Sequence, residues 1–347
     1  MALTKFLFRC DVSPAVGMGH LRRCLTLACE LKKQGASIYF LCRVEDFNWI
    51  KEVKSIADGW EELDWKLTPE ADADKVIHFY NTRKIDVAVI DHYRIDVAYQ
   101  QKLYTSKVRW LQFDGSAQQL FWADWVLNAS PAADKRGYGQ LKQREETQLL
   151  IGPDYALLRT EFSQYRQDVR LRDQVQKILL TLGGGADKGM TVFCLDAIKF
   201  IDPKIERVSL VSSANPHLSD IVEYVKKSGN ENIKLFVDSQ QIAQHMADVD
   251  IAITAGGTTT FETAMMGLPS LIVQIADNQS LNAKAWQEYG VAIDLGLFSK
   301  LKRQVLEKKT VEVINNSKLC KSMSDKGKIM VDGLGASRVA QILSKER

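Results

Sequence analysis

The histidine at position 20 combines a reactive side chain with a location where open α/β folds bind ligands. The apolar stretch 5–10 predicts a strand, and residues 19–33 predict a helix because their apolar residues recur every three or four positions. His20 therefore lies at a strand-to-helix turn, at the carboxyl edge of the expected sheet. An imidazole exchanges a proton near neutral pH, which suits general acid–base catalysis. The alternative is a structural or surface histidine.

Two glycines precede this histidine, Gly17 and Gly19, and they permit a tight turn into the helix. The N–H groups and the positive dipole end of a helix N-terminus favour an anionic ligand there. The spacing resembles a dinucleotide-binding fingerprint, but Arg22 stands where the third glycine would be, which disfavours NAD or FAD. We expect no cofactor, and we expect Asp11, Gly17, Gly19 and Arg22 to contact the substrate.

Polar side chains also end two further apolar stretches of the first half. Asp91, His92 and Tyr93 follow one predicted strand, and Asp114 follows the next. The carboxyl ends of parallel strands share one edge of a sheet, so these side chains should face the same crevice. Asp91 could instead cap the next helix. We expect His20, Asp91, Tyr93 and Asp114 to form a catalytic rim that positions a sugar and activates a water molecule.

The second half contains two glycine-rich turns of a type that binds nucleotides. Gly183-Gly184-Gly185 follows a predicted strand, and residues 254–262 again run from strand through glycines to helix. Backbone N–H groups and the hydroxyls of residues 258–260 can hydrogen-bond a diphosphate, although the first turn could be a plain tight turn. Glu262 could accept both hydroxyls of a ribose, or it could be an ordinary solvated helix residue. The expected nucleotide contacts in this half are Gly184, Gly257, Thr258, Thr259, Glu262, Asn278 and Gln279.

Apolar runs alternate with amphipathic stretches along the chain, which predicts parallel sheets covered by helices. We expect an α/β protein with two doubly wound, Rossmann-like domains, over residues 1–150 and 151–296. Residues 297–347 should form a helical tail that crosses back to the first domain, and the polar residues 131–148 should be a linker. Strands are predicted at 5–10, 37–42, 87–90, 109–113, 125–128, 177–182, 208–212, 233–236, 251–254 and 270–273.

The composition argues against several classes of protein. The 46 basic and 43 acidic residues give a net charge of +3, and the basic residues are scattered, which is not the pattern of a nucleic-acid-binding protein. No apolar run approaches the ~18 residues of a membrane span, and the N-terminal segment lacks the pattern of a signal peptide. The six cysteines show no paired ligand spacing. We expect reduced thiols, no metal site and a cytoplasmic protein.

Several short motifs occur in one order over residues 5–296. They are Arg9-Cys10-Asp11-Val12-Ser13, Gly17-Met18-Gly19-His20-Leu21-Arg22-Arg23-Cys24-Leu25, Ile90-Asp91-His92-Tyr93, Phe113-Asp114, Leu127-Asn128, Gly152-Pro153-Asp154-Tyr155-Ala156-Leu157-Leu158-Arg159, Ser213-Ala214-Asn215-Pro216, Ala255-Gly256-Gly257-Thr258-Thr259-Thr260-Phe261-Glu262 and Asp277-Asn278-Gln279. With these motifs the sequence resembles the UDP-sugar hydrolases of the pseudaminic acid pathway and the related spore coat polysaccharide proteins. The glycine–threonine–glutamate segment alone also resembles the lipid-II-forming GlcNAc transferase.

The resemblance implies a GT-B-like fold with a cleft between two domains. It also implies metal-independent hydrolysis of UDP-2,4-diacetamido-2,4,6-trideoxy-β-L-altropyranose to UDP and the free sugar, with inversion at the anomeric carbon. In this comparison His20 is catalytic, Tyr93 is an active-site tyrosine and Glu262 binds the ribose. The further substrate contacts that the resemblance implies are Asn128, Arg159, Ser213, Phe236 and Val237, the last two through backbone next to the uracil.

Two positions depart from the family pattern. Gly115 follows Asp114 where the family often has a second acid, and Met18 stands where a small or polar residue is commoner. Either change could alter which sugar is bound. The main alternative function is an inverting GT-B glycosyltransferase with a UDP-sugar donor, in which an acceptor hydroxyl replaces water. A nucleotide-sugar-binding protein without activity is a more distant alternative.

Overall fold

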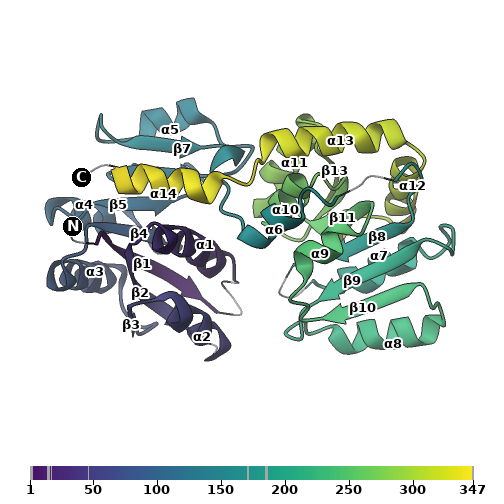
Figure 1. The fold of residues 1–347 in the computed structure, drawn as a ribbon, viewed down its shortest axis with the longest axis horizontal. Coiled ribbons are helices and arrows are strands. Elements are labelled where there is room, and N and C mark those ends of the chain that lie inside the picture. Colours follow the sequence, from purple (N-terminus) through teal and green to yellow (C-terminus); the bar gives the residue numbers. More distant parts are fainter. Residues whose placement is uncertain are drawn as a thin grey trace. The chain divides into compact units, whose positions relative to one another are not determined.

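The computed structural model describes residues 3–13, 16, 18–45, 47–169, 172–183 and 187–345. The chain forms two compact units, the first from residues 1–158 and 334–347 and the second from residues 159–333 (Figure 1). This division differs from the predicted boundary at residue 150. Within the predicted tail, the residues up to 333 belong to the second unit and residues 334–347 belong to the first.

The described part of the first unit contains a seven-stranded parallel sheet in the order β3-β2-β1-β4-β5-β6-β7. Its strands are β1 (Lys5–Val12), β2 (Ser37–Val44), β3 (Gly59–Glu62), β4 (Val87–Asp91), β5 (Trp110–Phe113), β6 (Trp125–Asn128) and β7 (Gln148–Ile151). The order of the strands reverses between β1 and β4, which pair directly. In such a sheet, ligands bind outside the carboxyl ends of the two strands at the reversal.

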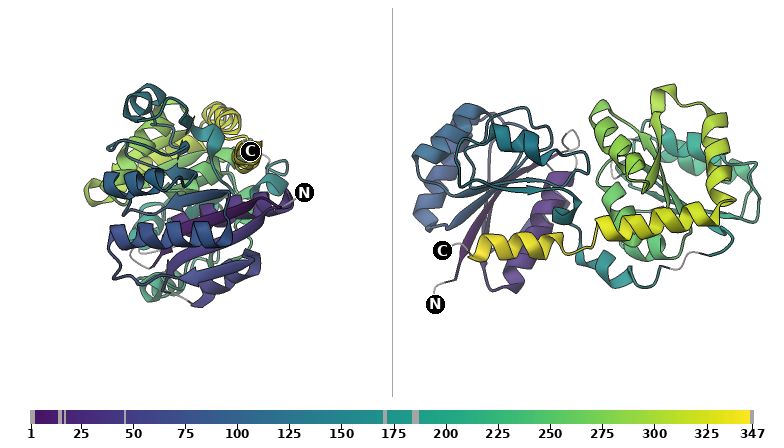
Figure 2. Two further views of the ribbon diagram at one scale, coloured as in Figure 1. Left: turned by 90° about the vertical axis from the view of Figure 1, so that its left-hand side faces the viewer. Right: turned by 90° about the horizontal axis from the view of Figure 1, so that it is seen from above.

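Helices cover both faces of this sheet. One face packs against α1 (Gly19–Lys33), α2 (Phe47–Ile56) and the last helix, α14 (Gly335–Lys345). The other face packs against α3 (Pro69–Arg83), α4 (Val97–Thr105) and α5 (Lys135–Leu141). α14 lies beside α1 although the two helices are at opposite ends of the chain (Figures 1 and 2). The buried side chains of Val339, Ala340 and Leu343 join α14 to the core of the first unit.

The second unit has the same type of architecture. Its described residues contain a six-stranded parallel sheet in the order β10-β9-β8-β11-β12-β13. Its strands are β8 (Lys177–Thr181), β9 (Glu206–Val211), β10 (Ile233–Val237), β11 (Ile251–Ala255), β12 (Ser270–Gln274) and β13 (Ala292–Leu297). The reversal falls between β8 and β11. In the sequence, these two strands are followed by the glycine-rich segments that are the nucleotide-binding candidates.

The helices of the second unit are α6 (Thr160–Tyr165), α7 (Met190–Ala197), α8 (Leu218–Ser228), α9 (Ile242–Ala247), α10 (Thr259–Met266), α11 (Ser280–Glu288), α12 (Arg303–Ile314) and α13 (Ser317–Met330). Helix α13 packs closely on α10, since a Cβ atom at Gly327 would lie 2.7 Å from the carbonyl oxygen of Ala264. Three short 3-10 helices, η1 (Pro153–Tyr155), η2 (Asp277–Gln279) and η3 (Phe298–Lys300), complete the described elements.

Each strand predicted from the sequence has an observed counterpart, but β3, β7 and β13 are not predicted. The segment 131–148 is not a linker. It contains α5, whose Tyr138 is buried and stacks on Phe121, and it leads into β7 at the edge of the sheet.

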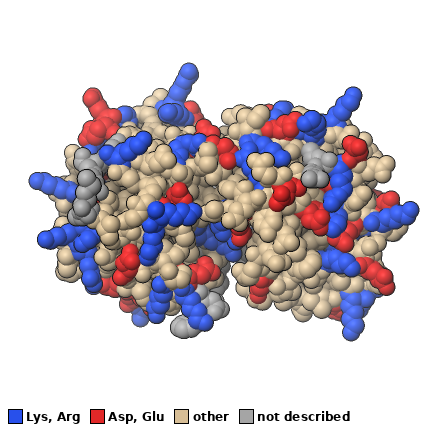
Figure 3. All heavy atoms as spheres, in the orientation of Figure 1, with Lys and Arg blue, Asp and Glu red and all other residues tan. Residues whose placement is uncertain are grey.

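The described helices include no candidate membrane span, and the face drawn in Figure 3 shows no large charged patch. No helix in the described ranges is long and apolar enough to cross a membrane. On the face drawn in Figure 3, the described basic and acidic side chains are interspersed over both units.

Candidate active site

The order of the strands brings the start of α1 next to the end of β4. His20, the second residue of α1, is 6% exposed, and its Nδ1 atom lies 2.6 Å from Oδ1 of Asp91, the last residue of β4. Asp91 is not the cap of the following helix. That role belongs to Asp96, whose carboxylate accepts a hydrogen bond from the N–H of Tyr99. The structure thus brings together two of the residues that the sequence predicts for the rim, and a hydrogen bond joins them.

The ionisation of Asp91 determines which nitrogen of His20 carries the proton. Burial by itself raises the pKa of the Asp91 carboxyl, but the Arg23 guanidinium and the His20 ring together lower it to about 2. Asp91 is therefore a carboxylate at neutral pH and can only accept hydrogen bonds. The contact with Asp91 then requires the proton on Nδ1, which leaves a lone pair on Nε2 of the neutral ring. This is the arrangement of a general base that a carboxylate orients.

Arg23 is a member of this cluster that the sequence analysis does not single out. Its Nε and Nη2 atoms contact the two oxygens of Asp91, and its guanidinium lies 4.7 Å from the centre of the Phe113 ring. A signal for it exists in the sequence, because Arg23 follows His20 by three positions on one helix and such residues share a face. The thiol of Cys24 also approaches Asp91, at 3.9 Å from Oδ2.

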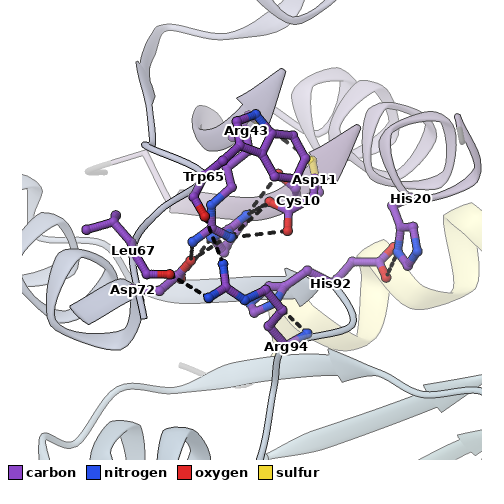
Figure 4. A network of polar contacts seen from close by, with 12 residues as sticks. Cys10, Asp11, His20, Arg43, Trp65, Leu67, Asp72, His92 and Arg94 are labelled. Carbon is purple, nitrogen blue, oxygen red and sulfur yellow. Dashed lines mark hydrogen bonds and ion pairs between the residues drawn. The ribbon is translucent and has the colours of Figure 1, made fainter. Parts of the chain in front are cut away.

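Tyr93 is the exposed neighbour of the histidine. Its side chain is 75% exposed, and its ring meets that of His20 edge to face, with the ring centres 4.6 Å apart. Next to Tyr93, Arg94 anchors the loop after β4, because its guanidinium donates hydrogen bonds to the carbonyl oxygens of Trp65 and Leu67 (Figure 4). The structure therefore brings together three of the four predicted rim residues.

His92 follows Asp91 in the chain but does not share its surroundings. Its ring is buried, Nδ1 accepts a hydrogen bond from the N–H of Arg94 at 3.2 Å, and the ring packs edge-on against Tyr99. Desolvation and the charge of Arg9 lower the pKa of His92 to about 3, so this ring is neutral. His92 is therefore part of the interior, contrary to the expectation that it faces the crevice with its neighbours.

Asp11, which the sequence predicts as a substrate contact, lies in a buried ionic cluster. Its carboxylate is bound by Arg9 and Arg43, and both arginines also bind Asp72 of α3. Figure 4 shows Asp11, Arg43 and Asp72 of this cluster. Both arginines are 0% exposed, and the two aspartates balance their charges. Buried charges persist only when they are paired and hydrogen-bonded in this way. The Asp11 side chain thus belongs to the framework that joins β1 and β2 to α3.

Asp114 has its own hydrogen-bond partners after β5. Its Oδ2 atom accepts hydrogen bonds from the N–H groups of Ser116 at 2.9 Å and Ala117 at 2.7 Å, and from the hydroxyl of Tyr138. Asn128 donates from Nδ2 to the same hydroxyl at 2.7 Å. The structure thus links the predicted residues Asp114 and Asn128 through a tyrosine that the sequence analysis misses. The carboxylate that contacts His20 is that of Asp91 at the end of β4, and not that of Asp114.

In the second unit, Gln279 fixes the turn after β11. Its Oε1 atom accepts hydrogen bonds from the N–H of Gly256 at 3.2 Å and from the N–H of Ile275 at 2.8 Å. A Cβ atom at Gly256 would lie 2.9 Å from Cβ of Gln279, so this close approach requires glycine. The amide oxygen of Gln279 therefore positions the turn, and the N–H of Gly256 is already used within the protein.

The three threonines after this turn have different surroundings. Thr258 is exposed and makes no side-chain capping bond, and Thr259 is half-buried as the first residue of α10. Thr260 is buried; its hydroxyl donates to the carbonyl oxygen of Gly257 at 2.7 Å and accepts a hydrogen bond from Nε1 of Trp286 at 3.0 Å. This internal bonding removes Thr260 from the predicted phosphate contacts.

Glu262 lies in the first turn of α10, and its Oε1 atom is 3.8 Å from Nη2 of Arg159. The same guanidinium pairs with Glu161 at 2.9 Å through Nη1. The Nε and Nη2 atoms of Arg159 are buried and make no hydrogen bond within the described part of the chain. Two predicted substrate contacts from distant parts of the sequence thus meet beside the turn.

The remaining predicted contacts are dispersed. Phe236 and Val237 are 39% and 43% exposed on the edge strand β10, and the Phe236 ring lies 4.4 Å from that of His245. The N–H of Ser213 donates to Asp238 at 2.9 Å. Asn278 and Arg22 are exposed, and a Cβ atom at Gly19 would meet nothing within 4 Å. Gly17 and Gly184 lie outside the described residues.

Known proteins with similar sequences agree with the motifs. The chain is 26% identical over 336 residues to the spore coat polysaccharide biosynthesis protein SpsG of Bacillus subtilis, covering 94% of both chains. It is 26% identical over 293 residues to the UDP-2,4-diacetamido-2,4,6-trideoxy-beta-L-altropyranose hydrolase of Campylobacter jejuni, covering 84% of this chain and 98% of that enzyme. The resemblance predicted from the motifs is confirmed.

Similar structures agree on the architecture. The MurG structure from Acinetobacter baumannii superposes with a TM-score of 0.72 at 16% identity, over 98% of this chain and 99% of that one. A glycosyltransferase from Rickettsia africae superposes with a TM-score of 0.65 at 13% identity, over 100% of both chains. Residues 167–276 also match the family model described as LpxB, lipid-A-disaccharide synthetase. The fold is thus the predicted GT-B-like pair of Rossmann-like domains, here with parallel sheets of seven and six strands.

Proposed function

We propose that this protein hydrolyses a UDP-linked 2,4-diacetamido-2,4,6-trideoxy sugar, of the L-altrose type, to UDP and the free sugar in pseudaminic acid biosynthesis. The observation that carries the proposal is the contact of Nδ1 of His20 with the carboxylate of Asp91 at 2.6 Å. The similarity to the Campylobacter jejuni hydrolase over 84% of the chain supports the choice of substrate.

In the proposed reaction, His20 accepts a proton from a water molecule through Nε2. The water oxygen forms a bond to the anomeric carbon while the bond from that carbon to the β-phosphate oxygen breaks. The electron pair of the broken bond stays on the diphosphate, and the configuration at the anomeric carbon inverts. The imidazolium formed in this step is stabilised by the Asp91 carboxylate beside it, and Tyr93 lines the sugar next to the ring.

The second unit binds UDP in this proposal. The diphosphate would accept hydrogen bonds from N–H groups at the start of α10 and from the hydroxyls of Thr258 and Thr259, next to the positive end of the helix dipole. Glu262 would bind the ribose hydroxyls, and the backbone of Phe236 and Val237 would contact the uracil. A leaving diphosphate whose charge is held in this way requires no metal ion.

A second candidate function is glycosyl transfer from a UDP-sugar. It is favoured by the match of residues 167–276 to the lipid-A-disaccharide synthetase model and by the fold shared with a glycosyltransferase. In that reaction His20 would take the proton from an acceptor hydroxyl in place of water. The chemistry at the base is the same, so the acceptor distinguishes the two functions.

The experiment that tests the proposal is proton NMR of the purified protein with UDP-2,4-diacetamido-2,4,6-trideoxy-L-altrose and no acceptor. We expect UDP and the free sugar to accumulate, with the inverted anomer formed first. His20→Asn should lower turnover by about 10²–10⁴-fold and leave UDP affinity nearly intact. The matched control is His78→Asn, which changes an exposed histidine of α3 and should retain full activity. Turnover only after addition of a hydroxyl acceptor would favour the glycosyltransferase.

A further inference from the structure

The guanidinium of Arg23 shares the carboxylate of Asp91 with the ring of His20. We infer that Arg23 is a positioning residue that holds the His20–Asp91 pair in place and, as a neighbouring cation, opposes protonation of the His20 ring. The inference rests on the proposed function in one respect only, namely that His20 acts as the base. The comparisons with known proteins assign no role to Arg23.

The guanidinium of Arg23 clamps Asp91, because it binds both carboxylate oxygens at once. Its Nη2 atom lies 2.5 Å from Oδ1 of Asp91 and its Nε atom contacts Oδ2, so that the planar guanidinium binds both oxygens. The Phe113 ring lies under the guanidinium, 4.7 Å from it. The side chain of Asp91 is 2% exposed and that of Arg23 is 33% exposed. Because Asp91 cannot rotate in this clamp, the oxygen that accepts the hydrogen bond from His20 has a fixed direction.

The charge of Arg23 acts on the same ring. Its Nη2 atom lies 3.1 Å from Nδ1 of His20, so that a proton gained by the ring would put a second positive charge next to the first. A nearby like charge disfavours the charged form of a titrating group, and a nearby opposite charge favours it. Asp91 alone would favour the imidazolium. Arg23 neutralises Asp91 and so opposes protonation of His20 in the resting enzyme.

Few other groups can affect this balance. Among the described residues, the titratable groups that face the pair are the Cys24 thiol on α1, the Tyr93 hydroxyl on the loop after β4 and the Cys10 thiol on β1, which is in register with Asp91. Strand β5 contributes only the ring of Phe113, which does not titrate. Cysteine and tyrosine side chains are neutral or anionic and never cationic, so Arg23 is the cation whose removal should change the protonation of His20.

The test is a pH titration of the full chain labelled with ¹⁵N in its histidines, with the His20 signal assigned by its loss in His20→Asn. In Arg23→Gln, we expect the His20 ring to gain its proton at a pH about one unit higher than in the unchanged protein. Arg23→Lys keeps the positive charge but cannot bind both oxygens, so the titration should move by much less. Lys33→Gln, on the same helix, removes a cation that pairs at the surface with Glu30 and should move nothing.

Turnover gives a second readout. The acid limb of the rate profile should move to higher pH in Arg23→Gln and move by much less in Arg23→Lys. The plateau rate should fall by about 10–100-fold in both variants, because the pair is no longer held in one geometry. KM should change little in comparison.

An unchanged titration in folded Arg23→Gln would overturn the inference. If Arg23→Gln does not fold, the plateau rate of Arg23→Lys tests the inference. A plateau rate of Arg23→Lys equal to that of Lys33→Gln would show that Arg23 does not hold the pair in place. The titration of His20 requires no substrate. A protein that shows the shift but does not hydrolyse the sugar nucleotide would contradict the proposed function and leave the role of Arg23 intact.

Discussion

The Nδ1 atom of His20 lies 2.6 Å from Oδ1 of Asp91, a residue 71 positions away in the chain. His20 lies at the start of α1 and Asp91 at the end of β4. They meet because β1 and β4 are neighbours at the point where the strand order of the sheet reverses. The hydrogen bond determines which nitrogen is protonated, so it determines whether Nε2 can accept a proton.

Asp91→Asn should therefore abolish most activity without removing the histidine. The amide can donate a hydrogen bond to Nδ1, which stabilises the tautomer with the proton on Nε2, and that tautomer is not a base at the required position. We expect turnover to fall by about 10²–10⁴-fold in a UDP-release assay, with UDP affinity unchanged. Asp74→Asn is the control, since this aspartate pairs with Lys102 at the surface. A rate near that of the control would contradict the assigned role of Asp91.

The buried cluster of Arg9, Arg43, Asp11 and Asp72 should contribute to stability. Asp72→Asn would leave two buried cations with one anion, and we expect the free energy of unfolding to fall by about 3–5 kcal/mol. The exposed pair of Asp74 and Lys102 should be worth less than about 1 kcal/mol, so Asp74→Asn provides the comparison. Urea unfolding at pH 7 measures both. Equal effects of the two substitutions would show that the cluster is not stabilising.

The same cluster predicts a pH dependence. Burial alone raises the pKa of the Asp72 carboxyl, but hydrogen bonds and charge from Arg9 hold it well below its usual range. A lowered pKa in the folded state means that the stabilisation is complete above the unfolded value of about 4 and is lost as the pH falls below it. The stability difference between the unchanged protein and Asp72→Asn should therefore shrink between about pH 4 and pH 2, which acid titrations followed by circular dichroism can measure.

The sequence predicts much of this fold because its signals are local. The helix at residues 19–33 matches α1 at both ends, since its apolar face and the glycine before His20 define it. Strand β3 is missed because Trp60 is the single apolar side chain among its four residues, none of which is buried at this edge of the sheet. Strand β13 is missed because Asp294 and Gly296 interrupt its apolar run.

The candidate site is less predictable because it depends on which strands are neighbours. Strand ends predict that His20 and Asp91 share an edge, but not that a hydrogen bond joins them. The same reasoning puts Asp11 and Gln279 on the ligand side, whereas Asp11 is bound by two buried arginines and Gln279 by two backbone N–H groups. Long-range partners of this kind leave no local pattern in the sequence.

Catalysis should proceed without a divalent cation, because the proposed mechanism neutralises the diphosphate with N–H groups and hydroxyls at the start of α10. We expect the initial rate of UDP release to be the same in excess EDTA as in buffer. Activity that disappears with EDTA and returns with Mg²⁺ or Mn²⁺ would refute this prediction and require carboxylates at the site to act as ligands.

Glu262 should bind the ribose of UDP, and its removal should weaken nucleotide binding more than catalysis. A carboxylate accepting hydroxyl hydrogen bonds contributes about 1–3 kcal/mol, so Glu262→Ala should raise the dissociation constant of UDP by about 5–150-fold in titration calorimetry. Glu312→Ala removes a glutamate that pairs with Lys309 on the surface of α12, and it should bind UDP normally. Because Arg159 lies beside Glu262, thermal unfolding of the variant without ligand must first establish that the turn remains folded. A stable Glu262→Ala protein with the UDP affinity of Glu312→Ala would exclude Glu262 from the nucleotide site.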